Sequence, residues 1–242
     1  MADEWFKNWF DTSYYHTLYQ NRSEEEAKLF IKNLLNFLEP KNGAHFLDIA
    51  CGKGRHARQI HEQGHQVIGY DLSEASIQEA SKLKKDGLSF YVHDMRTLFR
   101  TNFFDYSLNL FTSFGYFDSI RDEQNAISSA SKSLKKGGTF VLDFLNKDRV
   151  LKNLINEEVK TIDHIEFKIK RFVKDDKIQK QINFLVDGQE RQYTEKVKLL
   201  TLTDFEQYFQ FSELTIKHVF GDYDLSPFEQ YSNRLILIAE KT

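Results

Sequence analysis

The sequence predicts a doubly wound α/β domain with a mostly parallel sheet, into which an antiparallel β meander is inserted. Two observations favour this fold class. Over residues 44–144, short apolar runs typical of buried strands alternate with longer segments whose apolar residues recur every three or four positions, as on a helix face. Over residues 165–199, apolar and polar residues instead alternate with period two. No stretch rich in Pro, Gly or Ser separates the two patterns, so we expect a single domain over residues 1–242.

The first helix should begin at Ser23 and end before Pro40. Ser23 and Glu26 form a capping-box pair, and acidic residues fill the first turn, where the helix dipole stabilises negative charge. One face should be buried, because apolar residues recur along it at helical spacing. These residues are Ala27, Phe30, Ile31, Leu34, Leu35 and Leu38.

Five strands of the parallel sheet should follow, at residues 44–50, 67–70, 88–92, 106–111 and 139–144. Their connections are too long for hairpins, which implies parallel strands joined by right-handed crossovers. The first crossover helix should run over residues 55–63 and end at Gly64, which suits a left-handed position because it lacks a Cβ.

Two more crossover helices are expected. Ser73 should cap one, and Gly137-Gly138 should end the other. Their inward residues should be Ile77, Ala80 and Leu83 in the former and Ile120, Ile127, Ala130 and Leu134 in the latter.

The second half of the chain should begin with the meander. Its strands are expected at residues 165–170, at 178–184 and around Tyr193 to Leu199, with turns at Asp175-Asp176 and Asp187-Gly188. A helix capped by Thr203 and Glu206 should then run to about Phe211. Two last strands should lie at residues 214–220 and 235–240.

Composition and charge bear on the partners and the location of the protein. A net charge of -3, with lysines interleaved among acids, disfavours a nucleic-acid partner. No apolar run is long enough to span a bilayer, and the N-terminus is unlike a secretory signal, so no membrane association is expected. Cys51 is the only cysteine, which rules out an internal disulfide and fits a cytoplasmic protein. A homodimer is left open.

A glycine-bearing turn follows the first strand of the sheet. Glycines at a strand-to-helix turn let the backbone approach a ligand closely, and the helix N-terminus behind them presents free amides. The pattern Gly52-x-Gly54-x-x-Ala57 therefore indicates a nucleotide-like ligand. On its own it also satisfies the dinucleotide fingerprint, in which a pyrophosphate sits on those amides.

Acidic residues at three strand ends favour one ligand. Asp48, just before the turn, would repel a pyrophosphate but can orient the amino acid end of a cationic sulfonium. Asp71 can accept both ribose hydroxyls of either cofactor. Asp94 can accept from an adenine amine, with Met95 packed on the ring. Together they favour S-adenosylmethionine.

These segments resemble the successive motifs of class I S-adenosylmethionine-dependent methyltransferases. The resemblance rests on residues 47–54, Tyr70-Asp71, His93-Asp94-Met95 and residues 104–111, in order and spacing over residues 44–146. It is strongest to small-molecule members whose glycine motif continues as Gly-Arg-His. One departure is Ala50, where many members have glycine; it adds only one methyl, so binding should survive.

The resemblance implies a Rossmann-like sheet of seven strands whose last strand is antiparallel. It implies an N-terminal lid and helix over residues 1–40, a cofactor-binding core over 44–146, an antiparallel insertion over about 159–200, and a C-terminal helix and strand pair over 203–242. In similar enzymes a segment like the one around Tyr15 folds over the cofactor, and Arg22 would pair with the methionine carboxylate.

The cofactor-binding residues expected on these grounds lie in the turn, at the strand ends and in the lid. They are Asp48, Ala50, Cys51, Gly52, Gly54, His56, Asp71, Leu72, Asp94, Met95, Phe111, Tyr15 and Arg22. The aromatic residues within 111–117, at the carboxyl edge of the sheet, would line the pocket for the methyl acceptor.

The sequence therefore predicts methyl transfer from S-adenosylmethionine to a small-molecule acceptor that it does not identify. Catalysis should rest on positioning and desolvation, so no catalytic residue is assigned, and His16, His93 and Tyr116 are equal candidates for taking up a proton. No metal site is expected, because no acid or thiolate joins His56, His61 and His65 at ligand spacing. A nicotinamide-dependent oxidoreductase and a non-catalytic protein that binds S-adenosylmethionine or a nucleoside remain alternatives.

Overall fold

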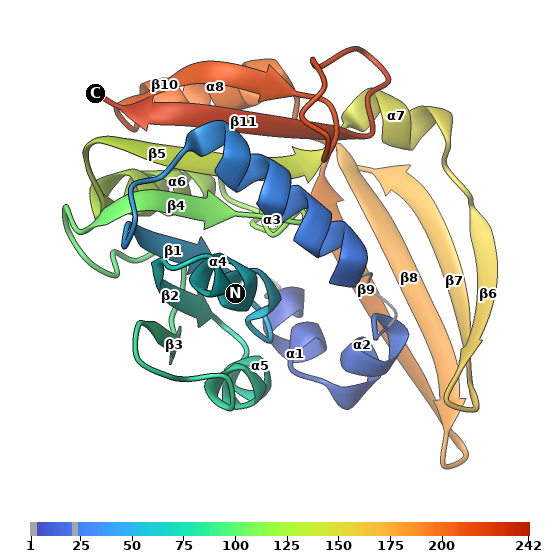
Figure 1. Cartoon of the computed structure of the whole chain (residues 1–242). Helices are drawn as coiled ribbons and strands as arrows, with labels where there is room; N and C mark the ends of the chain where they lie inside the picture. The colour runs from blue at the N-terminus through green and yellow to red at the C-terminus, as the bar shows by residue number, and fades with distance from the viewer. Residues whose placement is uncertain (1–3, 21–23) are drawn as a thin grey trace.

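The computed structural model describes residues 4–20 and 24–242 (Figure 1). Its centre is a seven-stranded sheet in the order β10-β11-β5-β4-β1-β2-β3. The strands are β1 (His45–Ile49), β2 (Gln66–Asp71), β3 (Leu88–Val92), β4 (Phe104–Asn109), β5 (Leu134–Leu145), β10 (Leu214–Phe220) and β11 (Arg234–Lys241). Neighbours from β3 to β5 pair in parallel, while β11 is antiparallel to both β5 and β10. The predicted sheet is confirmed.

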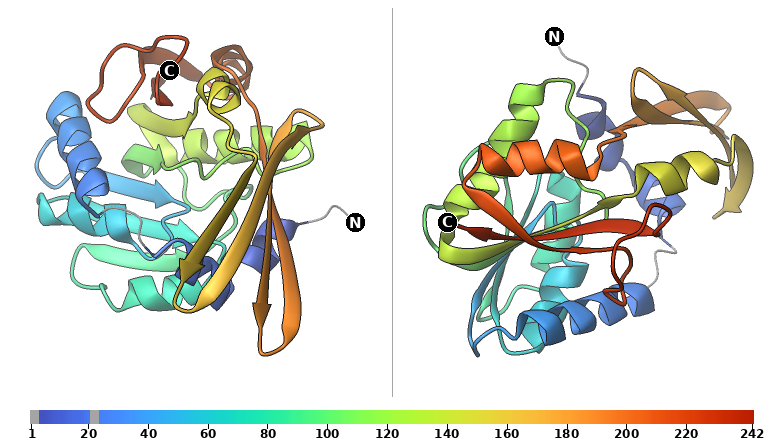
Figure 2. Two further views of the ribbon diagram at one scale, coloured as in Figure 1. Left: turned by 90° about the vertical axis from the view of Figure 1, so that its right-hand side faces the viewer. Right: turned by 90° about the horizontal axis from the view of Figure 1, so that it is seen from above.

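Helices cover both faces of this sheet, as Figure 2 shows from above. One face packs against α3 (Glu24–Leu38), α4 (Arg55–Glu62) and α5 (Glu74–Ser81), around a core that includes Phe30, Ile60 and Phe90. The other packs against α6 (Ile120–Ser133) and α8 (Leu202–Gln210), around Leu47, Phe140 and Phe205. Residues of one strand alternate between the two cores, as expected for a sheet buried on both sides.

The crossover helices lie where the sequence places them, with three corrections. Gly137-Gly138 does not end α6, which stops at Ser133; the glycines lie within β5. Leu134, expected on the inward face of this helix, is instead the first residue of β5. A Cβ on Gly138 would stand 2.8 Å from the Lys135 carbonyl oxygen, and Gly137 has a φ of 73°, so the glycines allow a close approach and a left-handed bend within an irregular strand. Ile120, expected to point inward, is 62% exposed because it is the first residue after the Ser119 cap.

The N-terminal segment forms two short helices that the sequence did not indicate, α1 (Trp5–Phe10) and α2 (Ser13–Leu18). They are called the N-terminal helix pair below. The helix α3 then begins at Glu24, and its apolar face is buried as expected. Ser23 lies outside the described residues, so its capping role stays a prediction.

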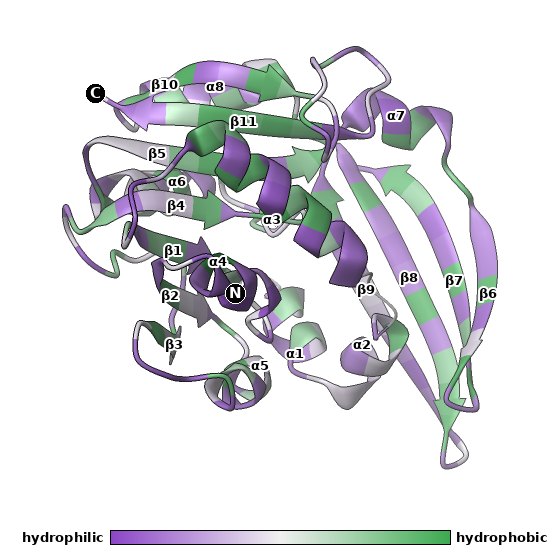
Figure 3. Ribbon diagram, in the orientation of Figure 1, coloured by the Kyte–Doolittle hydropathy of each residue, from purple (hydrophilic) through white to green (hydrophobic). Residues whose placement is uncertain are grey.

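Residues 157–198 form a separate four-stranded antiparallel sheet, called the insertion below. Its strands are β6 (Glu157–Ile162), β7 (Ile165–Lys174), β8 (Lys177–Val186) and β9 (Gln189–Lys198), and it follows α7 (Lys147–Lys152). Both predicted turns are present, with positive φ at Asp175, Asp176, Asp187 and Gly188. Figure 3 shows hydrophobic and hydrophilic residues alternating along its strands. The edge strand β6 was missed because its residues are mostly exposed.

The C-terminal elements close the sheet. The capping box of α8 is formed by Thr201 and Asp204, two residues before the predicted Thr203 and Glu206. The Thr201 hydroxyl and the Asp204 carboxylate each bond the backbone amide of the other residue, so the box is complete at this earlier position.

Among the described residues, no helix is long and apolar enough to cross a membrane.

Candidate active site

A cavity of about 570 Å³ opens at the carboxyl ends of β1, β2, β3 and β4, beneath the N-terminal helix pair. This is the edge at which doubly wound sheets bind ligands. Most of the predicted cofactor-binding residues line it. They are Asp48, Ala50, Cys51, Gly52, His56, Asp71, Leu72, Asp94, Met95, Phe111 and Tyr15. Arg22 lies outside the described residues, so its predicted contact remains a prediction.

The glycine turn is left-handed at three positions. Ala50, Gly52 and Gly54 have φ of 57°, 54° and 79°. Nothing lies within 4 Å of a Cβ built on Gly52, which leaves room for a ligand beside the backbone. Gly54 is different: its Cβ would lie 2.6 Å from the ring of Phe90, and it does not line the cavity. Position 54 must therefore be glycine because the turn packs closely against Phe90 of β3.

Asp48 is the most deeply buried acid of the cavity, at 1% exposure. One carboxylate oxygen accepts a hydrogen bond of 3.1 Å from the backbone amide of Ala57, in the first turn of α4. Burial raises the pKa of its carboxyl to about 7, and the charge of Asp71 adds to this, against the Ala57 amide and Arg55. A positive ligand group at this position would stabilise the charged form.

Asp71 braces the turn from the end of β2. Its two oxygens accept hydrogen bonds of 2.9 Å from the amides of Gly52 and Ser73. Burial raises its pKa, although these amides oppose the shift. The Leu72 amide also bonds this carboxylate, which has about four acceptor positions and so can still accept from a ribose hydroxyl.

Asp94 carries an ion pair that sequence reasoning missed. Arg96 approaches its carboxylate at 2.6 Å and also pairs with Glu4 at 2.7 Å and Asp122 at 3.6 Å. Burial acts to raise the pKa of Asp94, but the hydrogen bonds and charge of Arg96 outweigh it, so the pKa is lowered. Arg96 therefore links Asp94, the acid that the sequence predicts beside the adenine, to the start of α1 and to the first turn of α6.

Aromatic side chains line the rest of the cavity. They are Phe6, Phe10, Tyr15, Tyr19, Tyr116 and Phe117. The ring of Tyr15 lies 4.9 Å from the rings of both Phe10 and Tyr19, and Phe10 lies 5.4 Å from Tyr116. These six residues are called the aromatic wall below. The sequence indicated Tyr15 and the two wall residues within 111–117. No local sequence signal indicated Phe6 and Phe10, the wall residues of α1.

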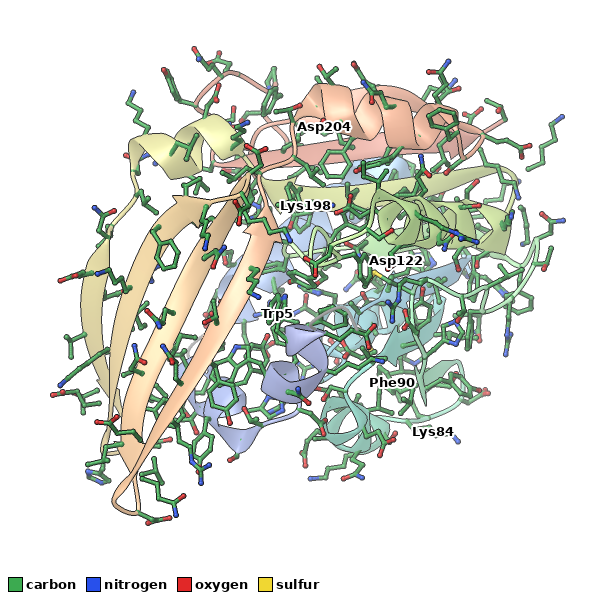
Figure 4. The ribbon with its side chains drawn as sticks, turned by 180° about the vertical axis from the view of Figure 1, so that it is seen from behind. Trp5, Lys84, Phe90, Asp122, Lys198 and Asp204 are labelled. Atoms are coloured by element: carbon green, nitrogen blue, oxygen red, sulfur yellow. The ribbon has the colours of Figure 1, made fainter. Side chains whose placement is uncertain are left out.

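Two aromatic residues, one from the segment 111–117 and one next to Tyr15, serve packing instead. Phe114 is buried and its ring lies 5.9 Å from that of Phe205 of α8. Tyr14 packs on Phe184 of the insertion at 4.9 Å. Trp5 supports the wall from behind, with its ring 5.4 Å from Tyr116, and Figure 4 shows it where the insertion meets the core.

The insertion fastens the N-terminal helix pair over the cavity. The Glu195 carboxylate of β9 accepts hydrogen bonds of 2.7 Å from both the Trp9 indole and the Tyr19 hydroxyl. The Lys180 ammonium lies 4.4 Å from the centre of the Tyr19 ring and 3.7 Å from Glu195. The strand β9, although far from Tyr19 in the sequence, thus holds the Tyr19 side chain of the aromatic wall in place.

The remaining candidates are a thiol and three imidazoles. Burial raises the pKa of Cys51 well above its usual range, so its thiol stays protonated, in keeping with a packing role. His16, His56 and His93 line the cavity, and the His56 ring lies 5.0 Å from that of Phe111. Across the described residues, no three His, Cys, Asp or Glu side chains come together in a way that would hold a metal ion.

The hydrogen-bond acceptors of the cavity fit S-adenosylmethionine. Carboxylates from three adjacent strand ends converge on one space, where they suit an ammonium group, ribose hydroxyls and an amine-bearing base. The open side of Gly52 gives the ligand room against the turn. A diphosphate at the same place would face the buried Asp48 and Asp71, and like charges at short range repel.

Comparison with known proteins agrees with this geometry. A family model described as a methyltransferase domain matches residues 40–198. The chain is 29% identical over 97 residues to a dTDP-3-amino-3,4,6-trideoxy-alpha-D-glucopyranose N,N-dimethyltransferase of Streptomyces venezuelae, a match covering 40% of each protein. It is 30% identical over 135 residues to a glycine/sarcosine N-methyltransferase of Parasynechococcus marenigrum (strain WH8102), covering 54% of this chain and 46% of the relative. The chain thus spans less than half the length of each relative.

The fold has close counterparts among solved structures. A S-adenosylmethionine-dependent methyltransferase from Clostridium acetobutylicum ATCC 824 superposes with a TM-score of 0.79, over 94% of this chain and 95% of the other, at 20% identity. At that identity the likeness shows a shared fold. This likeness does not identify a methyl acceptor for the chain.

Proposed function

Because the chain belongs to the class I S-adenosylmethionine-dependent methyltransferase family, we propose that it methylates an amine nitrogen of a small molecule. The observation that carries the proposal is a cavity in which three strand-end carboxylates adjoin an aromatic wall. The two relatives reported above are named as N-methyltransferases, which supports an amine as the acceptor class. The family does not favour a nicotinamide-dependent oxidoreductase.

The cofactor half of the site is proposed to use the residues that the sequence indicated. Asp48 would hold the ammonium group of the methionine part, Asp71 the ribose hydroxyls, and Asp94 with Met95 the adenine. Leu72 and His56 would close the sides of the cavity. When bound, the cofactor supplies an electrophilic methyl group on a sulfonium centre.

The aromatic wall is proposed to hold the acceptor. Aromatic rings exclude water and attract cations through their faces, which suits an amine that gains positive charge on methylation. The wall and the strand ends would together align the nitrogen with the sulfonium methyl, a contribution that needs no ionisable residue. A neutral amine has a lone pair and attacks without first losing a proton, so no general base is assigned.

Incubation with isotopically methyl-labelled S-adenosylmethionine tests the proposal. The acceptor panel should contain small primary and secondary amines, amino sugars, hydroxy acids and thiols, and mass spectrometry should locate the label. We expect label on nitrogen. Label on oxygen or sulfur alone would contradict the amine assignment. Saturable cofactor binding with no label on any acceptor would favour the non-catalytic binding protein.

A further inference from the structure

The chain adopts an unfavourable conformation beside the cavity, directly after β4. Phe111 and Thr112 both have φ of 58°, in the left-handed region that residues with a Cβ rarely occupy. Two consecutive residues of this kind need support from their surroundings. Phe111 lines the cavity, so the conformation of this pair decides where its ring stands.

Asp143 of β5 holds the backbone of both residues. Its carboxylate accepts a hydrogen bond of 2.8 Å from the amide of Phe111, and its backbone carbonyl accepts one of 3.0 Å from the amide of Thr112. The Asp143 side chain is fully buried. A buried carboxylate needs a partner charge, because its desolvation is otherwise unfavourable.

Arg234 of β11 supplies that charge and bonds the strained pair directly. Its Nε donates to Asp143 at 2.7 Å, and its Nη2 donates to the Thr112 hydroxyl at 2.8 Å. A planar guanidinium can make both contacts at once, whereas an ammonium group offers a single point of contact.

Tyr223, in the loop between β10 and β11, completes the support. Its hydroxyl donates to the Asp143 carboxylate at 3.1 Å, and its ring stacks 5.4 Å from that of Phe111. Phe30 of α3 also stacks on the Tyr223 ring, with 4.4 Å between the ring centroids. Asp143, Arg234 and Tyr223 are called the Asp143 cluster below.

We propose that the Asp143 cluster consists of positioning residues that hold Phe111 and Thr112 in the left-handed conformation required for binding the cofactor. The inference rests on the proposed function. Among the described residues, the antiparallel β11 and the loop before it contribute nothing to the cavity lining. The inference gives them a role in the site, because they contact Asp143 of the neighbouring strand β5.

The test compares two tyrosines that make the same kind of bond in different places. Tyr223→Phe removes the hydroxyl donated to Asp143. Tyr208→Phe is the matched control, because the Tyr208 hydroxyl donates to buried Glu123 at 2.5 Å, and Lys198 pairs with Glu123 at 3.0 Å, away from the cavity lining. Figure 4 shows Lys198 where β9 meets the core.

Calorimetric titration with S-adenosylmethionine, on variants whose folding is checked by circular dichroism, gives the readout. We expect about threefold weaker binding for Tyr223→Phe and about tenfold for Arg234→Lys, with Tyr208→Phe unchanged. Equal affinities in Tyr223→Phe and Tyr208→Phe would overturn the proposal. Should Arg234→Lys fail to fold, Tyr223→Phe still decides.

A double-mutant cycle separates positioning from general damage. Glycine reaches positive φ without support, so in a Thr112→Gly background Arg234→Lys should weaken binding by less than about twofold. The same tenfold loss in both backgrounds would show that the conformation of Thr112 is not what Arg234 maintains. A wild-type chain that fails to bind S-adenosylmethionine would remove the proposed function and this inference together, whereas wild-type binding with unchanged variants would remove the inference alone.

Discussion

The carboxyl group of Asp48 should make cofactor binding depend on pH. Its pKa is raised to about 7, chiefly by burial, and only the charged form attracts an ammonium group. Affinity for S-adenosylmethionine should therefore fall as the pH is lowered from 7.5 to 5.5, by up to about tenfold per pH unit below the pKa. Calorimetric titration across this range would reveal it, and a flat profile would contradict the placement of the ammonium group.

Asp48→Asn should separate binding from stability. The amide oxygen can still accept from Ala57, but the charge is lost, so affinity should drop and its pH dependence should vanish. Because burial raises the pKa of the folded carboxyl from 3.8 to about 7, the wild-type protein loses stability as the pH rises through the interval between these two values. Above pH 7 the variant should thus be more stable in the absence of ligand, by up to about 4 kcal/mol, as measured by urea unfolding at pH 8.

Ala50 gives a second test at the scale of one residue. Its φ of 57° is strained for alanine, and glycine would remove that strain while loosening the unfolded chain. Ala50→Gly should raise the free energy of unfolding by about 0.5 to 1 kcal/mol. The control is Ala75→Gly in α5, where glycine should instead lower it by about 0.5 to 1 kcal/mol. A loss of stability in Ala50→Gly would mean that the turn is not left-handed there.

Single residues also mark how far sequence reasoning reaches. Strand-end acids can be located from the sequence, because the carboxyl ends of the predicted parallel strands meet at one edge of the sheet. Partners from distant segments cannot be located in this way. Arg96 was missed because Glu4 and Asp122, which share it with Asp94, are far away in sequence. Gly54 fits the glycine motif, but only the position of Phe90 shows that it serves packing.

At the scale of elements, the strands and helices of the parallel core were predictable because their signals are local. Apolar periodicity, a Ser73 cap and the Asp187-Gly188 turn each act within a few residues. The helices α1 and α2 have six residues each, too short to be stable alone, and they pack against the insertion and against Tyr116 and Phe117. Short segments of this kind carry little periodic signal.

The link between the insertion and α1 can be tested through Glu195. Glu195→Gln keeps an oxygen acceptor but loses the charge, so the bonds from Trp9 and Tyr19 should weaken by about 1 to 2 kcal/mol in total. Hydrogen exchange should then rise in residues 5–20 and stay unchanged in β1. The control is Glu190→Gln, on the same strand but exposed. Unchanged exchange in residues 5–20 would show that other contacts fix the helix pair.

For the whole molecule, ligand binding should appear as added thermal stability. A ligand at a hundredfold its dissociation constant adds about 2.7 kcal/mol to the folded state. For a chain of this size, that corresponds to a rise in Tm of about 5 to 10 °C. S-adenosylmethionine should produce the shift, and NADH at the same concentration should not. A shift with NADH alone would contradict the cofactor assignment.

The bond between Trp9 and Glu195 joins residues 186 positions apart and has a consequence for the order of events during synthesis. The Trp9 side chain is translated long before Tyr193 and Glu195 of β9, its ring neighbour and its hydrogen-bond acceptor. Until β9 has been made, the Trp9 ring has neither of these partners and is able to associate with other nascent chains. Co-translational folding can therefore complete the packing of the N-terminal helix pair only after the insertion has been translated.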